Sequence, residues 1–199
     1  PMTELEYEKS SRGPGTAVDD EYAWGNTTIV AGGTISGTEN GNEIVVTANA
    51  NCIYNDTLFS GGDAGKGPVR SGIFATALSS RAESGAGYYG VMELSGNVWE
   101  RCVTIGNAQG LNYIGTHGDG NLTSTGNGTN TDWPGIDSTP SNGITGANGS
   151  GFRGGGWYEG AADGLEVGNR RWAARTDTNR SNSGSNFWGY GGRCARTKP

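Results

Sequence analysis

Glycine is the residue that most constrains what this chain can fold into, because 38 of its 199 residues are Gly. A glycine-rich backbone loses much conformational entropy on folding, and Leu, Ile, Val and Phe together number only 29. Six Trp and eight Tyr supply bulky apolar surface instead,. Charged residues make up 17% of the chain, too few for a charge-expanded disordered chain,. The composition therefore predicts a folded, loop-rich protein in which aromatic side chains pack against glycine.

The charge balance excludes one class of partner. The chain has 14 basic and 20 acidic residues, a formal net charge of -6 and a pI near 4.8. Binding to a phosphate backbone requires clustered Lys and Arg, so we expect no nucleic-acid partner. No apolar run approaches the roughly 18 residues that a membrane span requires, so we also expect no membrane span in this chain.

The cysteines do not form a metal-binding pattern. Cys52, Cys102 and Cys194 lie far apart in the sequence, and His117 is the only histidine. This spacing excludes zinc-finger and zinc-ribbon patterns. One disulfide with one free thiol is possible, but three reduced and buried thiols are favoured, because free Cys is commonly a core residue.

The first residues carry the signals of a capped helix. Thr3 can cap the first turn, Glu6 can return a hydrogen bond to it, and Met2 can pack against Tyr7,. The pattern predicts a helix from Thr3 to Arg12.

Further along the chain, the sequence predicts short strands separated by long loops. The segment 27–50 has β-branched runs around Asn40-Gly41, the dipeptide typical of a hairpin turn,. A dense apolar block predicts a core strand over Asn97–Val103,. Residues 107–151 are rich in Gly, Asn and Thr and predict irregular structure,. Three later pieces have the composition of short strands: FRGGGWY, NRRWAAR and YGGRCAR.

Several sequence blocks, taken together in order, resemble one family. They are PMTELEYEKSSRG (1–13), AWGN (23–26), GVMELSGNVWERC (90–102), FRGGGW (152–157) and GGRCAR (191–196). This order resembles the formylglycine-generating enzyme (sulfatase-modifying factor) family, whose domain is a version of the C-type lectin fold. The resemblance implies a single α+β domain over 1–199 with a short helix, small antiparallel sheets and high loop content. It also implies that the N-terminal part of the family domain lies outside this sequence.

The same resemblance indicates that the family's catalysis is lost. Those enzymes hold copper between two thiols that follow the RGG motif, and here Glu159 occupies the position of the first thiol. No Cys lies between Cys102 and Cys194, and a single histidine cannot form the iron-binding triad of a related branch. We therefore expect no enzymatic activity. The alternative is a formylglycine-generating-enzyme-like oxidoreductase or another enzyme, for example one that uses Glu159 and Asp163 as paired carboxylates.

A structural calcium ion is a further implication of the resemblance. In the family, the segment matching GVMELSGNVWE binds calcium through two side chains and two main-chain carbonyls. Carried over to this sequence, the ligands are the Glu93 and Glu100 side chains and the carbonyls of Gly96 and Val98, an oxygen set that suits calcium. The alternative is that Glu100 pairs with a core arginine such as Arg153.

The C-terminal region 152–196 resembles the variable region of proteins diversified by retroelements, a non-enzymatic branch with this same fold. Such elements copy a template with errors at adenines, so Asn codons become codons for many residue types, including Tyr, Asp, Ser, Arg, Gly, Ala and Phe, but never for Trp, Glu, Lys, Gln or Met. The residues that this mechanism cannot produce from an Asn codon are expected to be scaffold: Trp157, Trp172, Trp188, Glu159 and Glu166.

The residues expected to face a ligand are interspersed among this scaffold. They are Tyr158, Asp163, Asn169, Arg171, Asp177, Arg180 and Phe187. Tyr, Arg and Phe supply rigid anchors, and Asn supplies adaptable hydrogen bonds; the alternative for each is a solvated loop position. The expected function is recognition of a protein or another cell-surface ligand, on a cell or virion exterior. A calcium-dependent glycan-binding lectin is a second alternative, although the usual sugar-binding motifs of such lectins are absent.

Overall fold

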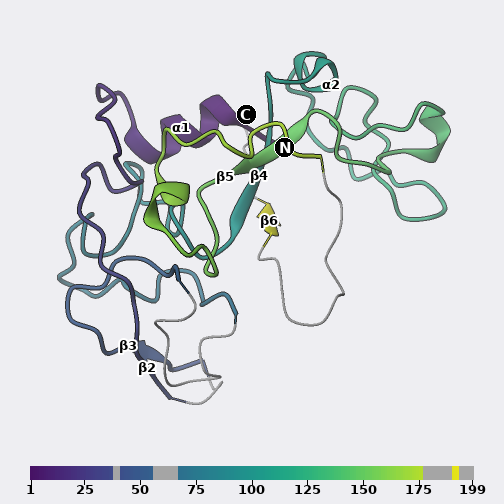
Figure 1. Cartoon of the computed structure of the whole chain (residues 1–199). Helices are drawn as coiled ribbons and strands as arrows, with labels where there is room; N and C mark the ends of the chain where they lie inside the picture. Colours follow the sequence, from purple (N-terminus) through teal and green to yellow (C-terminus); the bar gives the residue numbers. More distant parts are fainter. Residues whose placement is uncertain (38–40, 56–66, 177–189, 193–199) are drawn as a thin grey trace.

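One strand, β4 (Trp99–Val103), organises the main sheet of this small mixed α+β protein. The computed structural model describes residues 1–37, 41–55, 67–176 and 190–192 (Figure 1). On one side, β4 pairs antiparallel with β5 (Ser150–Arg153). On the other side it pairs parallel with both β1 (Met2–Thr3) and β6 (Tyr190–Gly192). The expectation of an antiparallel core was therefore wrong for two of the three pairings. Parallel partners come from remote segments joined by long connections, and local sequence patterns do not reveal them.

The predicted N-terminal helix is confirmed as α1 (Glu4–Arg12). The Glu6 N–H donates to Thr3 Oγ1 at 3.2 Å, and the Thr3 N–H donates to Glu6 Oε2 at 2.8 Å. These reciprocal bonds satisfy backbone donors that the first helical turn leaves unpaired. Met2 and Tyr7 are buried in the same apolar cluster, as the predicted contact between them requires.

Strand β4 begins two residues later than the sequence predicts. Gly96 and Asn97 have φ values of +86° and +64°, a left-handed conformation that a strand cannot contain,. The Asn97 side chain stabilises this bend through Val69: its Oδ1 accepts from the Val69 N–H at 2.8 Å, and its Nδ2 donates to the Val69 carbonyl at 3.0 Å.

The remaining elements are short. Within the predicted hairpin, β2 (Ile35–Ser36) pairs antiparallel with β3 (Ile44–Val45). The predicted irregular region contains α2 (Ala108–Leu111), the 3-10 turn η2 (Pro140–Asn142), two isolated β-bridges and the first two residues of β5. Much of this region projects to one side of the sheet (Figure 1). A second 3-10 turn, η3 (Ala162–Leu165), follows β5. Within the described ranges, no helix has both the length and the apolar character that crossing a bilayer requires.

Two of the three expected late strands are present, at least in part. β5 covers the start of FRGGGWY and ends where Gly154 and Gly155 adopt positive φ. β6 covers 190–192, and the rest of that piece lies outside the described residues. The piece 169–175 was expected to be a strand but forms a turn, closed by a hydrogen bond from the Ala173 N–H to the Arg170 carbonyl at 3.0 Å.

Aromatic rings pack directly against glycine, as the composition predicts. A Cβ atom at Gly13 would lie 2.3 Å from the Tyr88 ring, and one at Gly156 would lie 3.0 Å from the Trp99 ring. The core also contains Cys52 and Cys102 as buried free thiols, and burial raises the pKa of both. The third thiol, Cys194, lies outside the described residues.

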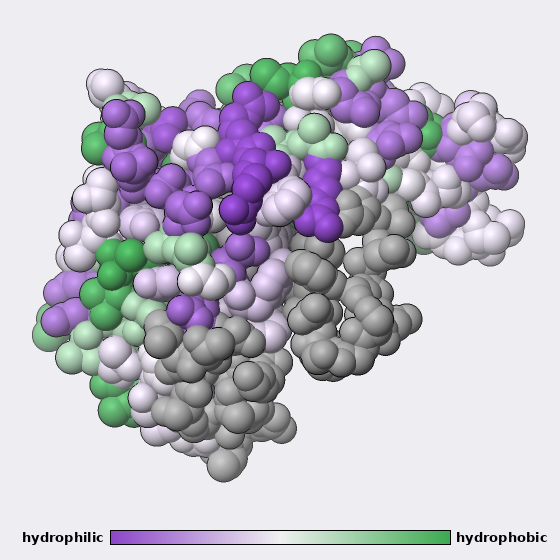
Figure 2. Space-filling model, in the orientation of Figure 1, coloured by the Kyte–Doolittle hydropathy of each residue, from purple (hydrophilic) through white to green (hydrophobic). Residues whose placement is uncertain are grey.

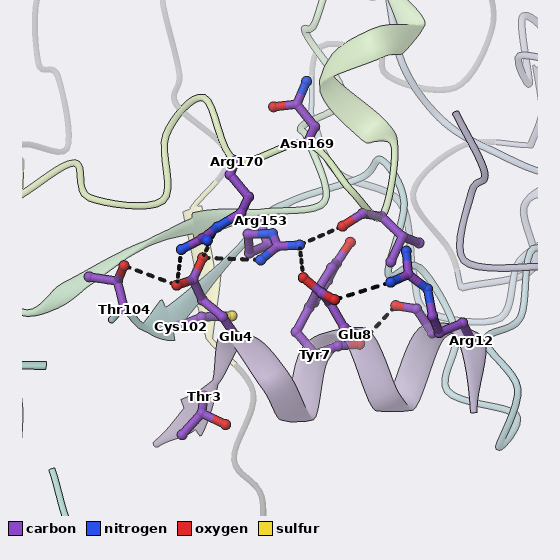
Figure 3. A network of polar contacts seen from close by, with 12 residues as sticks. Thr3, Glu4, Tyr7, Glu8, Arg12, Cys102, Thr104, Arg153, Asn169 and Arg170 are labelled. Carbon is purple, nitrogen blue, oxygen red and sulfur yellow. Dashed lines mark hydrogen bonds and ion pairs between the residues drawn. The ribbon is translucent and has the colours of Figure 1, made fainter. Parts of the chain in front are cut away.

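A buried guanidinium links the helix to the sheet (Figure 3). The Arg153 side chain on β5 is fully buried, with its Nη1 at 3.0 Å from Glu4 Oε1 and its Nη2 at 2.9 Å from Glu8 Oε1. Arg153 also donates to the carbonyl of Val167, in the segment after η3. The sequence analysis correctly expected Arg153 in the core, as a possible partner of Glu100. The ion pairs that the structure gives Arg153 are with Glu4 and Glu8 of α1.

Glu4 receives further donors at the centre of this network. Arg170 Nη2 lies 2.9 Å from Glu4 Oε2, and the Thr104 hydroxyl donates to the same oxygen at 3.0 Å. A buried carboxylate is tolerated when several such donors surround it. Helix α1, strand β5 and the chain around 167–170 are therefore held in one arrangement.

The close approach of Gly151 to the 171–175 turn gives a first prediction. A Cβ at Gly151 would lie 1.8 Å from the Ala173 carbonyl oxygen, a backbone atom that cannot swing aside. We expect Gly151→Ala to lower the free energy of unfolding by about 1–3 kcal/mol or more, measured by urea denaturation. The control is Gly168→Ala, where a Cβ meets nothing within 4 Å. Equal stability of the two variants would contradict the close packing of this turn against β5.

Candidate ligand-binding cleft

A cleft of about 330 Å³ opens between the sheet and the 171–175 turn. Four aromatic residues line it: Trp99, Phe152, Tyr158 and Trp172. Among the residues that the structure describes, the charged members of its lining are Glu159, Arg171 and Arg175, and Gly160 also lines it. The volume and the mixture of aromatic walls with a few charged groups fall within the range of small-ligand sites.

The sheet supplies one wall of the cleft. Trp99 opens β4 and Phe152 lies on β5, and their rings meet edge to face with centroids 6.3 Å apart. The Arg101 guanidinium lies over the Phe152 ring, 4.1 Å from its centroid. Because both rings are almost fully buried on paired strands, this wall is rigid.

Two loops supply the opposite wall. The segment after the buried Trp157 carries Tyr158 and Glu159, and the Glu159 carbonyl accepts from the Asn55 N–H at 2.9 Å. The 171–175 turn is attached to β5, because the Phe152 N–H donates to the Trp172 carbonyl at 3.0 Å. Both loops are therefore fixed through their backbones, which leaves their side chains available to shape the cleft.

Glu159 is the acidic group of the cleft. Its Oε1 accepts from Trp99 Nε1–H at 3.2 Å, and its Oε2 lies 3.4 Å from Arg171 Nη2. Burial raises the pKa of the Glu159 carboxyl above its usual range, while Arg171 and the Trp99 hydrogen bond oppose this shift. The carboxylate is thus held in place by a neutral donor and a cation.

Two guanidinium groups lie against the ring of Trp172. The Cζ atoms of Arg171 and Arg175 are 5.2 and 4.5 Å from the ring centroid, within the range of cation–π attraction,. The side chain of Arg171 is 47% exposed, so it is fixed along its length but remains accessible to solvent.

The structure brings together two of the residues predicted to face a ligand, Tyr158 and Arg171, which both line the cleft. Asp163 is exposed on η3, beside the cleft rather than in its lining. Asn169 is used inside its own loop: its Nδ2 donates to the Asp163 carbonyl at 2.7 Å, and its Oδ1 accepts from the Arg171 N–H at 3.0 Å. It thereby positions the backbone of Arg171.

The other three predicted contact residues, Asp177, Arg180 and Phe187, lie outside the described residues. Among the predicted scaffold residues, Trp157 is buried in an apolar cluster with Ile53, Ile73 and Phe74, and Trp172 is half-buried. Glu159 and Glu166 are partly buried as well, and Trp188 is not described.

Sequence reasoning missed four of the described lining residues: Trp99, Phe152, Gly160 and Arg175. A local signal exists for Arg175. In RRWAAR (170–175), Arg171 and Arg175 flank Trp172 within four residues, so a turn can bring both arginines close to its ring. Trp99 and Phe152 reach the cleft only through the pairing of β4 with β5, which no short motif encodes.

The two carboxylates predicted to bind calcium have different surroundings. The Glu93 carboxylate accepts from the Ser71 hydroxyl at 3.0 Å and from the Gly72 N–H at 3.0 Å. Glu100 is buried on β4, and its Oε2 lies 2.6 Å from the Cβ position of Gly154. Among the side chains that the structure describes, no three or more His, Cys, Asp or Glu are gathered as around a metal ion. The calcium assignment, which includes the carbonyls of Gly96 and Val98, stays a prediction, and nothing below depends on it.

A second hollow of about 220 Å³ lies between α1 and α2. Exposed Leu5, Ile105 and Leu111 line it, and Figure 2 shows hydrophobic residues gathered along the edge where Figure 1 places α2. Arg153 and Glu4 also line this hollow. It contains none of the predicted contact residues.

Comparison with known proteins gives no match to a family model, to a curated protein or to a solved structure.

The raised pKa of Glu159 gives a second prediction. At a pH between the usual glutamate pKa of about 4.3 and the raised pKa of the folded state, the folded protein binds more protons than the unfolded chain. The contribution of this group to stability therefore decreases as the pH rises through this interval,. Gln at this position keeps an acceptor for Trp99 Nε1–H without the charge. We expect Glu159→Gln to be at least as stable as the wild type near neutral pH, with the advantage shrinking towards about pH 4 in urea denaturation. A variant that is less stable at neutral pH, but not in acid, would show that the ion pair with Arg171 outweighs burial.

Proposed function

We propose that this chain is a non-enzymatic ligand-binding protein that presents variable side chains on a scaffold of the C-type lectin fold, in its formylglycine-generating-enzyme version. The observation that carries the proposal is the cleft, where Tyr158 and Arg171 come from different loops to one site. Tyr and Arg are the residue types that most often carry binding energy at protein interfaces. The proposed partner is a protein or another ligand on a cell surface.

The alternation of buried and accessible residues supports this proposal. We call six of the buried residues in and beside this region the frame: Gly151, Phe152, Trp157, Leu165, Val167 and Ala173. Between them lie the accessible Tyr158, Asp163 and Arg171. A frame that packs without these side chains allows them to change while the backbone stays in place.

The surroundings of Glu159 favour binding over catalysis. Where the resemblance implies a copper-binding thiol, this chain has a carboxylate that accepts from Trp99 and pairs with Arg171. Both contacts hold the group in a fixed position, which suits recognition. The glycan-binding alternative would use the same aromatic walls, and binding on a glycan array that a chelator abolishes would support it.

A peptide selection tests the binding face directly. We expect peptides selected from a random phage-displayed library on the wild-type protein to lose binding to the double variant Tyr158→Ser, Arg171→Ser. The matched control is Tyr89→Ser, Arg70→Ser, which removes the same side-chain types from other exposed positions. Circular dichroism of both variants confirms folding. Selected peptides that bind the two double variants equally well would overturn the proposed site.

The diversified nature of the region is tested in the encoding DNA. We expect a near-copy of the segment that encodes 152–196, differing mainly at adenines and lying beside a reverse transcriptase gene. Sequencing the flanking genomic region reads this out. If the flanking DNA lacks such a copy, the chain is a binding protein of fixed sequence and not a diversified one.

A further inference from the structure

We propose that the cleft binds the carboxylate of an Asp or Glu side chain of a protein ligand, with Arg171 as the group that recognises it. This inference rests on the proposed function and adds the chemistry of the partner. Its basis is the juxtaposition of two guanidinium groups, one internal carboxylate and an aromatic wall in one cleft.

The first step is the charge of the lining. The whole chain is acidic, with a formal net charge of -6, yet the cleft has Arg171 and Arg175 against Glu159. The described part of the lining therefore carries one excess positive charge, which one carboxylate neutralises. A doubly charged phosphate would meet the Glu159 carboxylate and the nearby Asp163, which already acts on Glu159 electrostatically. The charge balance favours a single carboxylate.

The second step is the capacity of Arg171. A guanidinium has five N–H donors, and the contact with Glu159 uses one Nη2 at the long distance of 3.4 Å. A partly exposed ion pair of this kind contributes little by itself. Arg171 can therefore keep its place beside Glu159 and still donate to an incoming carboxylate, for which a guanidinium offers a bidentate fit.

The third step is preorganisation. The ring of Trp172 supports both guanidinium groups, and the Asn169 side chain holds the Arg171 backbone at 3.0 Å. A side chain that is already ordered loses less conformational entropy on binding. Two cations already lie near the ring of Trp172, which disfavours a cationic ligand there.

The fourth step concerns the rest of the ligand. The half-buried ring of Tyr158 lies in the cleft lining with the arginines, together with the rings of Trp99 and Phe152, which are almost fully buried. At Gly160, even an added Cβ would meet nothing within 4 Å, so this side of the cleft has room. The arrangement fits an acidic residue that is followed by an apolar one in the partner.

The experiment uses acetylated and amidated tetrapeptides that differ at one position. One has glutamate followed by phenylalanine at its centre, the second has glutamine in place of glutamate, and the third has phosphoserine. Binding to the ¹⁵N-labelled protein is followed through the indole Nε1–H signals of Trp99 and Trp172. We expect the glutamate peptide to bind at least about tenfold more tightly than the glutamine peptide, as for a charge-assisted pair, and more weakly as salt is added.

Two variants with the same change of charge identify the responsible arginine. Arg171→Gln is expected to abolish the preference for glutamate. Arg70→Gln, at an exposed arginine outside the cleft lining, is expected to retain it. The inference is overturned if the glutamate and glutamine peptides bind equally, if neither shifts the indole signals, if phosphoserine binds more tightly than glutamate, or if both variants have the same effect.

These outcomes are separate from the fate of the proposed function. If library-selected peptides depend on Tyr158 and Arg171 but show no preference for acidic residues, recognition at this face stands and the carboxylate inference fails. If selected peptides ignore the cleft, both fail.

Discussion

The structure depends most on the buried guanidinium of Arg153. It joins Glu4 and Glu8 of α1 to the Val167 carbonyl, so the first helix and a segment about 150 residues later share one set of polar contacts. Breaking a buried pair by removing one partner typically costs about 3–5 kcal/mol, because the other charge stays buried. In a chain with few aliphatic residues, this network fixes what a larger apolar core would otherwise fix. The Arg153 network also fixes one side of the cleft, because Arg153 is the last residue of the strand that carries Phe152.

The cleft combines two kinds of support that differ in how they respond to substitution. The rings of Trp99 and Phe152 lie on paired strands. The loop side chains of the lining belong to segments whose backbones are hydrogen-bonded to β5 and Asn55. Recognition sites are often built in this way, with variable loops on a rigid scaffold. If the cleft binds a ligand as proposed, substitution of Tyr158 or Arg171 would alter its affinity without altering the positions of Trp99 and Phe152.

Features encoded within a few residues were predictable from the sequence. The Thr3 capping box, the 27–50 hairpin and strand β4 are of this kind, since their signals are caps, turns and apolar runs. Features that depend on distant contacts were not. One such feature is the parallel pairing of β1 and β6 with β4. Another is the turn at 169–175, where a strand was expected, which packs closely against β5 at Gly151 and Ala173. Half of the cleft was hidden for the same reason, because Trp99 and Phe152 meet Arg171 only in the folded chain.

The absence of a side chain at Gly151 and the bulk of the frame residues have a genetic consequence. Codons for Gly, Ala and Val contain adenine only at the third position, where every base is synonymous, and codons for Trp and Phe contain none. A copying process that errs at adenines would leave Trp157, Val167 and Ala173 unchanged while it rewrites neighbouring Asn positions. The degeneracy of the code would then keep these packed positions constant, so that variants made in this way would differ in what they recognise.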